Sequence, residues 1–463
     1  MKIFKNILIL VLSSSLFVAC EPKFDDVPAA TAGSANFSVY VSIGEGTPSG
    51  YCNGALSREN QLSSTPFLLS EQFKAVGGGE FKQPLFPEGT SFGFEKGHPS
   101  TTLYLRERTF CDDSVELYSR MFDSSTFNYT PVQILGLTQS IRSGLTVAGP
   151  YNNLAANGAK TIFVNRPAPS ALGSDWGTGN SEIFYEIFKS TNPAATILSE
   201  AAALNPTFFS LQLGNTDILR YSKSGGNEDG GGADDNITPV QEFEDSLRSI
   251  VSTLTANGAK GVITDIIGIE SFPYYTHYKY DFLILSADSA AALTNFYAAT
   301  SGYTFKEGRN ALVIEDASAP FGHRRMLSDE FLLLEVPRDS LKCLGLGGRI
   351  PLGRRWVLDK GEIDTVNAAI DAYNAVIKQV ATDYDLAFAD GHDGFSDIIA
   401  GTYFNGKEVD ASFAGGYFSL DGLNISPLAQ AIAANNMISA INKKYGSTIR
   451  NVDINKYVGT SFK

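Results

Sequence analysis

From residue 37 onward, short apolar runs alternate with longer stretches whose apolar residues recur every three or four positions. Short runs of this kind predict buried strands, and the periodic stretches predict amphipathic helices. An alternation of the two favours a mainly parallel sheet covered by helices, so we expect an α/β fold. The strand candidates are residues 37–44, 161–165, 208–214, 261–269 and 385–390.

Three helices are predicted, two of them from an apolar stripe (238–258 and 363–380) and two from clear terminal signals (238–258 and 426–446). In residues 238–258, Thr238 is a natural N-cap, Pro239 fits the first helical position, Gln241 would complete a capping box, and Gly258 can end the helix. The last helix is predicted to begin at Ser426-Pro427 and to end at Gly446. The third helix covers residues 363–380. The stripes are expected to form core.

Two regions interrupt the alternation. Residues 225–236 form a Gly/Asp run that lacks the spacing and the closing glutamate of a calcium loop, so we expect a flexible surface loop. Residues 271–356 are rich in aromatic residues and arginines, which favours an inserted region that walls a pocket. A solvated surface with scattered Arg and Tyr is the alternative for this insertion.

The N-terminus has the pattern of an export signal, with two lysines ahead of a short apolar run. Phe17-Val18-Ala19-Cys20 resembles a bacterial lipobox, so residues 1–19 are predicted to be removed and Cys20 to be acylated, for example with palmitate. Residues 20–36 then form a polar tether, and residues 37–463 the folded part. We expect a lipoprotein of the outer membrane of a Gram-negative-type bacterium, on either face; a plain signal peptide is the alternative.

The net charge and the cysteine content limit which partners, disulfides and metal sites we expect. The formal net charge is −14, which argues against a nucleic-acid partner. In an exported protein Cys52 could pair with Cys111, and buried free thiols are the alternative. The chain has no C-x-x-C and no histidine pair at helical spacing, so no metal site and no cofactor are expected.

Four segments occur in an order that resembles a known family. They are VSIGEGTPSGYCNGALS (41–57), LTVAGPYNNL (145–154), NPTFFSLQLGNTDIL (205–219) and FSLDGLNISPLAQAIAANNMISAIN (418–442). Together they resemble the four motif blocks of the SGNH (GDSL) hydrolases, a lipase and esterase family, in a lipoprotein branch. The resemblance extends over nearly all of residues 37–463 and implies a flavodoxin-like, three-layer α/β/α fold with an inserted cap region.

The resemblance also assigns positions to the chemistry of that family. There a serine attacks an acyl ester, a histidine takes its proton, and an aspartate three residues before the histidine orients the ring. The serine N–H, a glycine N–H and an asparagine side chain hold the oxyanion. The corresponding positions here are Gly46 for the nucleophile, Gly149 for the glycine, Thr216 for the asparagine, Asn424 for the base and Asp421 for the orienting acid.

Only Asp421 keeps a catalytic side chain at these positions, so we expect a pseudoenzyme. The former cleft is expected to bind an acylated or glycan-like ligand with the residues Gly46, Gly149, Thr216, Asp421 and Asn424. One alternative is a weak, rewired ester hydrolase that uses Thr47 or Ser49 with His392. Another is an accessory or scaffolding lipoprotein that acts through the insertion, with a protein partner that the sequence does not name.

Overall fold

The computed structural model describes residues 29–95, 98–111, 115–120, 131–167, 181–228, 235–391 and 395–460. The predictions for the signal peptide (1–19), Cys20 and His392 lie outside these ranges, as do residues 20–28 of the tether and residues 229–234 of the Gly/Asp run. Within the described ranges, no helix combines the length and the apolar character that a membrane span requires.

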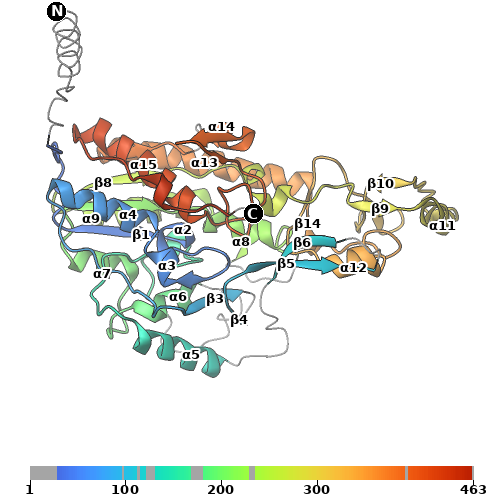
Figure 1. Ribbon diagram of the computed structural model, residues 1–463, viewed down its shortest axis with the longest axis horizontal. Coiled ribbons are helices and arrows are strands. Elements are labelled where there is room, and N and C mark those ends of the chain that lie inside the picture. The colour runs from blue at the N-terminus through green and yellow to red at the C-terminus, as the bar shows by residue number, and fades with distance from the viewer. Residues whose placement is uncertain are drawn as a thin grey trace, which may run out of the picture.

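The centre of the body is a four-stranded, fully parallel sheet with the strand order β1-β7-β8-β15 (Figure 1). Most residues of these strands are buried, as expected for a parallel sheet with both faces covered. The predicted α/β fold with a mainly parallel sheet is therefore confirmed, as are four of the five strand candidates. The strands are β1 Tyr40–Gly44, β7 Phe208–Gln212, β8 Lys260–Thr264 and β15 Ala387–Ala389.

The strand predicted at residues 161–165 is wrong, because Thr161–Phe163 is a short 3-10 helix. The backbone N–H and the hydroxyl of Thr161 both donate to Asp217 Oδ2, at 2.9 and 2.8 Å, so this donor is not available to a β-ladder. The segment that does run along the free edge of β1 is residues 152–156, where Ser42 N–H donates to the Asn152 carbonyl at 2.8 Å.

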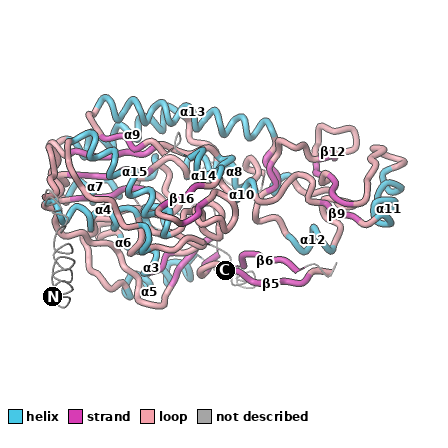
Figure 2. Tube along the Cα trace, turned by 45° about the horizontal axis from the view of Figure 1, so that its top comes forward, coloured by secondary structure: helices cyan, strands magenta, loops and turns pink. Residues whose placement is uncertain are grey.

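Two groups of helices enclose the sheet. Helix α9 (Val240–Thr255) packs against α7 (Ile197–Ala203) and the long α13 (Lys360–Asp383), which is prominent in Figure 2. Helix α15 (Pro427–Tyr445) packs against α4 (Thr65–Phe73). Helices from both groups contact the sheet, and the apolar stripes predicted from the sequence are buried against it.

The predicted cap of the last helix is confirmed, whereas that of α9 is wrong. Ser426 Oγ accepts the backbone N–H of Ala429 at 3.2 Å, and Gly446 ends α15 with a φ of 65°. Helix α9 begins after Pro239 without a side-chain cap. The carbonyl of Thr238 instead accepts the Tyr373 hydroxyl, which ties this residue to α13.

The remaining elements are short. The helices are α2 Gly46–Ser49, α3 Arg58–Gln61, α5 Pro131–Gly144, α6 Ser181–Phe188, α8 Thr216–Lys223, α10 Pro273–Thr276, α11 Ala287–Tyr297, α12 Arg338–Cys343 and α14 Phe395–Ala400. The strands are β2 Leu56–Ser57, β3 Ser91–Glu95, β4 His98–Ser100, β5 Tyr104–Thr109, β6 Val115–Arg120, β9 Leu283–Leu285, β10 Gly308–Asn310, β11 Val313–Glu315, β12 His323–Arg325, β13 Phe331–Leu332, β14 Val357–Leu358, β16 Thr402–Phe404 and β17 Lys407–Val409.

Residues 278–357, called the lobe below, project from one end of the body (Figure 1). The lobe has a hydrophobic cluster of its own, which includes Leu312, Val313 and Leu352. Its strands are short and form antiparallel pairs, β9 with β10, β11 with β12 and β13 with β14. The lobe therefore has a small core separate from that of the body.

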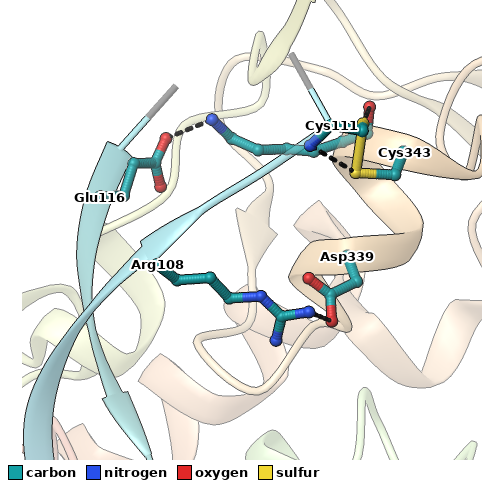
Figure 3. Close-up of a disulfide and its surroundings, with 6 residues drawn as sticks. Arg108, Cys111, Glu116, Asp339 and Cys343 are labelled. Atoms are coloured by element: carbon teal, nitrogen blue, oxygen red, sulfur yellow. Dashed lines mark hydrogen bonds and ion pairs between the residues drawn. A yellow bond between two sulfur atoms is a disulfide. The ribbon is translucent and has the colours of Figure 1, made fainter. Parts of the chain in front are cut away.

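A β-hairpin, β5 with β6, is joined to the lobe by a disulfide (Figure 3). Cys111 follows β5 and pairs with Cys343 at the end of α12, with a Cα–Cα distance of 5.7 Å. The pairing of Cys52 with Cys111 is therefore wrong, because Cys52 is a buried free thiol in the body. Beside the disulfide, Arg108 pairs with Asp339 and Glu116 with Lys342, each at 2.5 Å.

Candidate functional site

A large cavity of about 1310 Å³ opens where the four parallel strands end. Because parallel strands all finish at the same edge of a sheet, the residues that follow them gather there, and this edge is where open α/β sheets bind ligands. The residues after the strands that line the cavity include Glu45, Gly46, Asn215, Thr216, Asp265 and Asp390. The hairpin and the lobe contribute Leu103, Arg108, Leu334, Glu335 and Trp356.

Gly46, the predicted nucleophile position, lies on the floor of this cavity at the start of α2. A Cβ atom added to Gly46 would lie 2.5 Å from Asn424 Oδ1 and 2.7 Å from Asn157 Oδ1. Both distances are too short for carbon and oxygen, so a side chain at residue 46 requires these two amides to move. The space that a serine side chain would take is therefore flanked by two amide oxygens.

The structure brings Asp421 and Asn424 together, as the resemblance implies. Asp421 Oδ1 accepts the backbone N–H groups of Leu423 at 2.9 Å and Asn424 at 2.7 Å, and Oδ2 accepts Asn424 Nδ2 at 3.1 Å. The N–H of Gly54 also donates to Oδ2, at 3.2 Å. Asp421 is thus fixed by its neighbours and orients the Asn424 amide.

Glu45 is the functional candidate that the sequence reasoning missed. Its carboxylate accepts the backbone N–H groups of Asn215 at 2.8 Å and Thr216 at 2.6 Å, and it also accepts the Thr216 hydroxyl. Burial raises the pKa of Glu45 to about 7, against the lowering effect of the Thr216 hydroxyl, and the nearby Asp217 raises it further. An acidic residue directly after a buried strand, in the sequence IGEG, was the available signal.

Asp217, the residue after Thr216 in α8, is also fully buried. Burial raises the pKa of Asp217, while its hydrogen bonds from Thr161 act in the opposite direction. These bonds, together with a 2.8 Å bond from Arg220 to the Gly158 carbonyl, hold residues 158–161 against α8. The helix therefore positions the segment that brings Asn157 to the cavity.

Gly149 does not belong to the site that the structure forms. It is exposed and is not among the residues that line the cavity, whereas Asn157 and Gly158 are. The segment after Gly149 runs parallel to β1, so that Ala156 N–H reaches the Gly44 carbonyl at 3.0 Å at the end of the strand. The eight residues that follow Gly149 are thus needed to reach the cavity edge.

For the rewired ester hydrolase, the structure places one of the three proposed residues in the cavity lining. Thr47 lines the cavity, whereas Ser49 is buried outside it and donates its hydroxyl to the Gly46 carbonyl at 2.6 Å. His392 lies outside the described residues. Within the described part of the chain, no group of three or more His, Cys, Asp or Glu side chains is placed to hold a metal ion.

The fold and the cavity define an α/β protein with a ligand-sized site at the C-terminal edge of a parallel sheet. No protein-family model matches the chain, and no curated protein matches it. A solved structure with similarity is that of a candidate GDSL-like lipase from Parabacteroides merdae, with a TM-score of 0.27 and 11% identity. The alignment covers 68% of this chain and 83% of that one. At this TM-score the likeness supports no inference about activity.

Proposed function

We propose that this protein binds an organic ligand, acylated or glycan-like, in a former esterase cleft and does not hydrolyse it. The observation that carries the proposal is the arrangement at the sheet edge. Gly46 and Asn424 meet at this edge, with Asn424 bonded to Asp421, and by the sequence resemblance they correspond to the nucleophile and the base of the family. The cavity of about 1310 Å³ that surrounds them is large enough for a ligand beyond drug size.

The chemistry of these residues argues against ester hydrolysis. Gly46 has no group that could attack a carbonyl, and the amide of Asn424 does not accept a proton near neutral pH. Loss of the serine or the histidine of such a triad lowers turnover on the order of 10⁶-fold. Ser49, the nearest hydroxyl by sequence after Thr47, points to the Gly46 carbonyl and lies outside the cavity. A cleft that lacks the nucleophile and the base of the family fits a binding role.

The proposal includes attachment to the outer membrane through lipid on Cys20. It rests on the export signal and on the lipobox-like residues before Cys20. A single acyl chain gives only marginal membrane binding, so stable anchoring requires that this cysteine carry more than one chain. Metabolic labelling with an alkyne fatty acid, compared with the Cys20→Ala variant, tests the attachment.

The esterase prediction is tested with p-nitrophenyl butyrate and the full chain held in lipid nanodiscs, with empty nanodiscs as the blank. We expect no release of p-nitrophenol above the blank. The triple variant Gly46→Ser, Thr216→Asn, Asn424→His restores the family residues, and a fourth change, Asn157→Gly, removes the oxygen 2.7 Å from the added Cβ. We expect the quadruple variant to gain more activity than the triple variant.

The matched control carries Thr216→Asn, Asn424→His and Asn157→Gly but keeps Gly46. It therefore differs from the quadruple variant only in lacking the serine nucleophile. Hydrolysis by the natural protein that persists through a second purification would contradict the proposal. In that case, loss of activity in His392→Ala would assign the reaction to the rewired alternative.

A second candidate function, scaffolding through the lobe, is favoured by one observation. Of the twelve large apolar side chains exposed in the described residues, six lie in the lobe: Ile284, Phe296, Phe321, Leu327, Leu344 and Ile350. Single exposed apolar residues are ordinary, but a concentration of them is typical of contact surfaces. Cross-linking in intact cells, compared between the natural chain and the variant Ile284→Lys, Phe296→Lys, tests for a partner on this surface.

A further inference from the structure

The orientation of the Asn424 amide sets the hydrogen-bonding character of the cavity floor. The Asn424 amide donates its NH₂ group, Nδ2, to Asp421 Oδ2, at 3.1 Å. The Asn424 oxygen then faces the opposite way, toward Gly46. Asn157 places a second amide oxygen beside the same glycine. A ligand group that approaches Gly46 therefore meets two acceptors.

The hydrogen-bond donors at the start of α8 are already used. The N–H groups of Asn215 and Thr216 both donate to Glu45, at 2.8 and 2.6 Å. The Thr216 hydroxyl also donates to the Glu45 carboxyl group, which leaves lone pairs on the hydroxyl oxygen. An oxyanion or a carbonyl oxygen that entered this position would face oxygen atoms in place of free donors.

The charges on the cavity wall act in the same direction. Five acidic side chains line the cavity, those of Glu45, Asp265, Glu335, Asp390 and Asp421, against three cations, those of Arg108, Arg220 and Lys223. Arg108 pairs with Asp339 and Arg220 lies 3.8 Å from Asp235, while Asp390 lies 3.9 Å from Lys378. The wall therefore disfavours a fatty acid carboxylate or another anion.

The rest of the lining suits a sugar. Phe404 and Trp356 line the cavity with rings that are only partly buried, and such rings offer apolar faces to the C–H groups of a pyranose. Amides are numerous in the lining, including Asn405, Asn436 and Asn451. An amide both donates and accepts, as each sugar hydroxyl does, so the two kinds of group can pair in both directions.

We propose that the cavity floor at Gly46 binds a hydroxyl of a neutral oligosaccharide, with Asn424 Oδ1 and Asn157 Oδ1 as its acceptors. This inference rests on the proposed function and names the ligand class of the same cleft. The hydrogen-bonding polarity of the floor is thus the reverse of an oxyanion site: acceptors face the ligand, and the ligand supplies the hydrogens.

The test is isothermal titration of the full chain in nanodiscs with maltohexaose and cellohexaose, and with ethyl butyrate as the acyl probe. We expect one of the hexaoses to bind and ethyl butyrate not to bind. Asn157→Ala and Asn424→Ala should each weaken the binding about tenfold, because each removes one acceptor. Asn157→Asp keeps an acceptor at the same place and should retain the binding. Asn295→Ala, on the exposed face of α11, is the matched control and should bind like the natural chain.

The outcomes separate this inference from the proposed function. Binding of ethyl butyrate with no response to either hexaose, and no hydrolysis, would overturn the saccharide inference and leave the binding role intact. Hydrolysis of the ester by the natural chain would overturn the proposed function itself. Absence of binding by both hexaoses, or hexaose binding that Asn157→Ala and Asn424→Ala leave unchanged, would also overturn the inference. Circular dichroism of each variant shows whether a loss of binding reflects a loss of folding.

Discussion

The body and the lobe of this protein are stabilised by different means. The body has one continuous apolar core on both sides of its parallel sheet, with residues such as Phe209 and Tyr373 fully buried. The lobe has a small core and is fastened to the β5–β6 hairpin by a disulfide and by ion pairs. The comparison indicates that the body is stabilised mainly by its large buried core, whereas the lobe, whose short strands bury less surface, also depends on a covalent link.

The same contrast applies to charge. In the body, Glu45 and Asp217 are buried carboxylates whose hydrogen bonds come from backbone N–H groups and hydroxyls. In the lobe, the carboxylates have cationic partners, as in the pair of Arg324 with Asp316 at 2.7 Å. Burial therefore raises the pKa of Glu45, whereas the bond from the Ser318 hydroxyl, together with Arg324, lowers the pKa of Asp316 to about 2. Glu45 and Asp316 should therefore contribute to the pH dependence of stability with opposite signs.

The largest expected effect compares one core truncation in each region. Phe209→Ala removes a fully buried ring from β7 and should destabilise the whole body by about 3–5 kcal/mol. Leu312→Ala removes a comparably buried side chain from the lobe core, and its cost should fall on the lobe alone. Urea denaturation followed by hydrogen exchange of individual peptides measures both effects. If Leu312→Ala accelerated exchange in β1 and β7 as much as in the lobe, the two regions would form one cooperative unit.

The second prediction concerns the pH dependence of the body and uses Glu45→Gln. A folded-state pKa of about 7 against an ordinary value of 4.5 means that between these pH values the folded protein holds a proton that the unfolded chain has lost. The stabilisation from this bound proton is fully present below about pH 4.5. It is lost as the pH rises through about 7, and the free energy of unfolding falls by about 3 kcal/mol. Glu45→Gln should therefore flatten the fall in unfolding free energy between pH 4.5 and 7, as urea titrations at several pH values would measure.

The exposed Glu71 on α4 provides the control, because Glu71→Gln should leave the slope unchanged. Buried Asp217, whose pKa burial also raises, contributes in the same direction and remains in the variant, so a residual slope is expected. An unchanged slope in Glu45→Gln would show that this carboxylate is ionised in the fold at all these pH values.

The sequence predicted those parts of the fold that depend on local chemistry. Ser426 and Pro427 are sufficient to start α15, and the apolar runs after residue 37 identified β1, β7, β8 and β15, because these signals act within a few residues. The failures at residues 161–165 and at Thr238 both involve contacts with residues distant in the sequence. Asp217 accepts the Thr161 N–H that a strand would have used, and Tyr373 of α13 holds the Thr238 carbonyl, while α9 begins after Pro239 without a side-chain cap.

For the candidate site too, the sequence predicted the residues that lie in local motifs and missed those whose role depends on distant parts of the chain. Gly46, Thr216, Asp421 and Asn424 were identified because each lies in a motif, and the structure gathers all four at one cavity. Asn157 was missed in favour of Gly149, since only the three-dimensional path of the segment along β1 shows which residue reaches the sheet edge. Glu45 was missed because its role depends on two backbone N–H groups about 170 residues away.

The smallest of the three effects is expected for the disulfide that joins the hairpin to the lobe. Cys343→Ser removes a link between residues 232 positions apart, and such links typically contribute about 2–4 kcal/mol. We expect about 2 kcal/mol here, because the ion pairs Arg108–Asp339 and Glu116–Lys342 remain. Hydrogen exchange should increase in the hairpin and in α12 and stay unchanged in the parallel sheet.

Repeating the exchange measurement at high salt tests this last prediction further, because ion pairs at partly exposed positions weaken as the ionic strength rises. In Cys343→Ser, high salt should increase exchange in the hairpin further, whereas in the natural chain the disulfide should mask most of that change. Cys52→Ala removes the buried free thiol of the body and controls for a general effect of losing a cysteine. If Cys343→Ser left hairpin exchange unchanged even at high salt, packing alone would hold the hairpin to the lobe. The two regions would then differ in size but not in the means of their stabilisation.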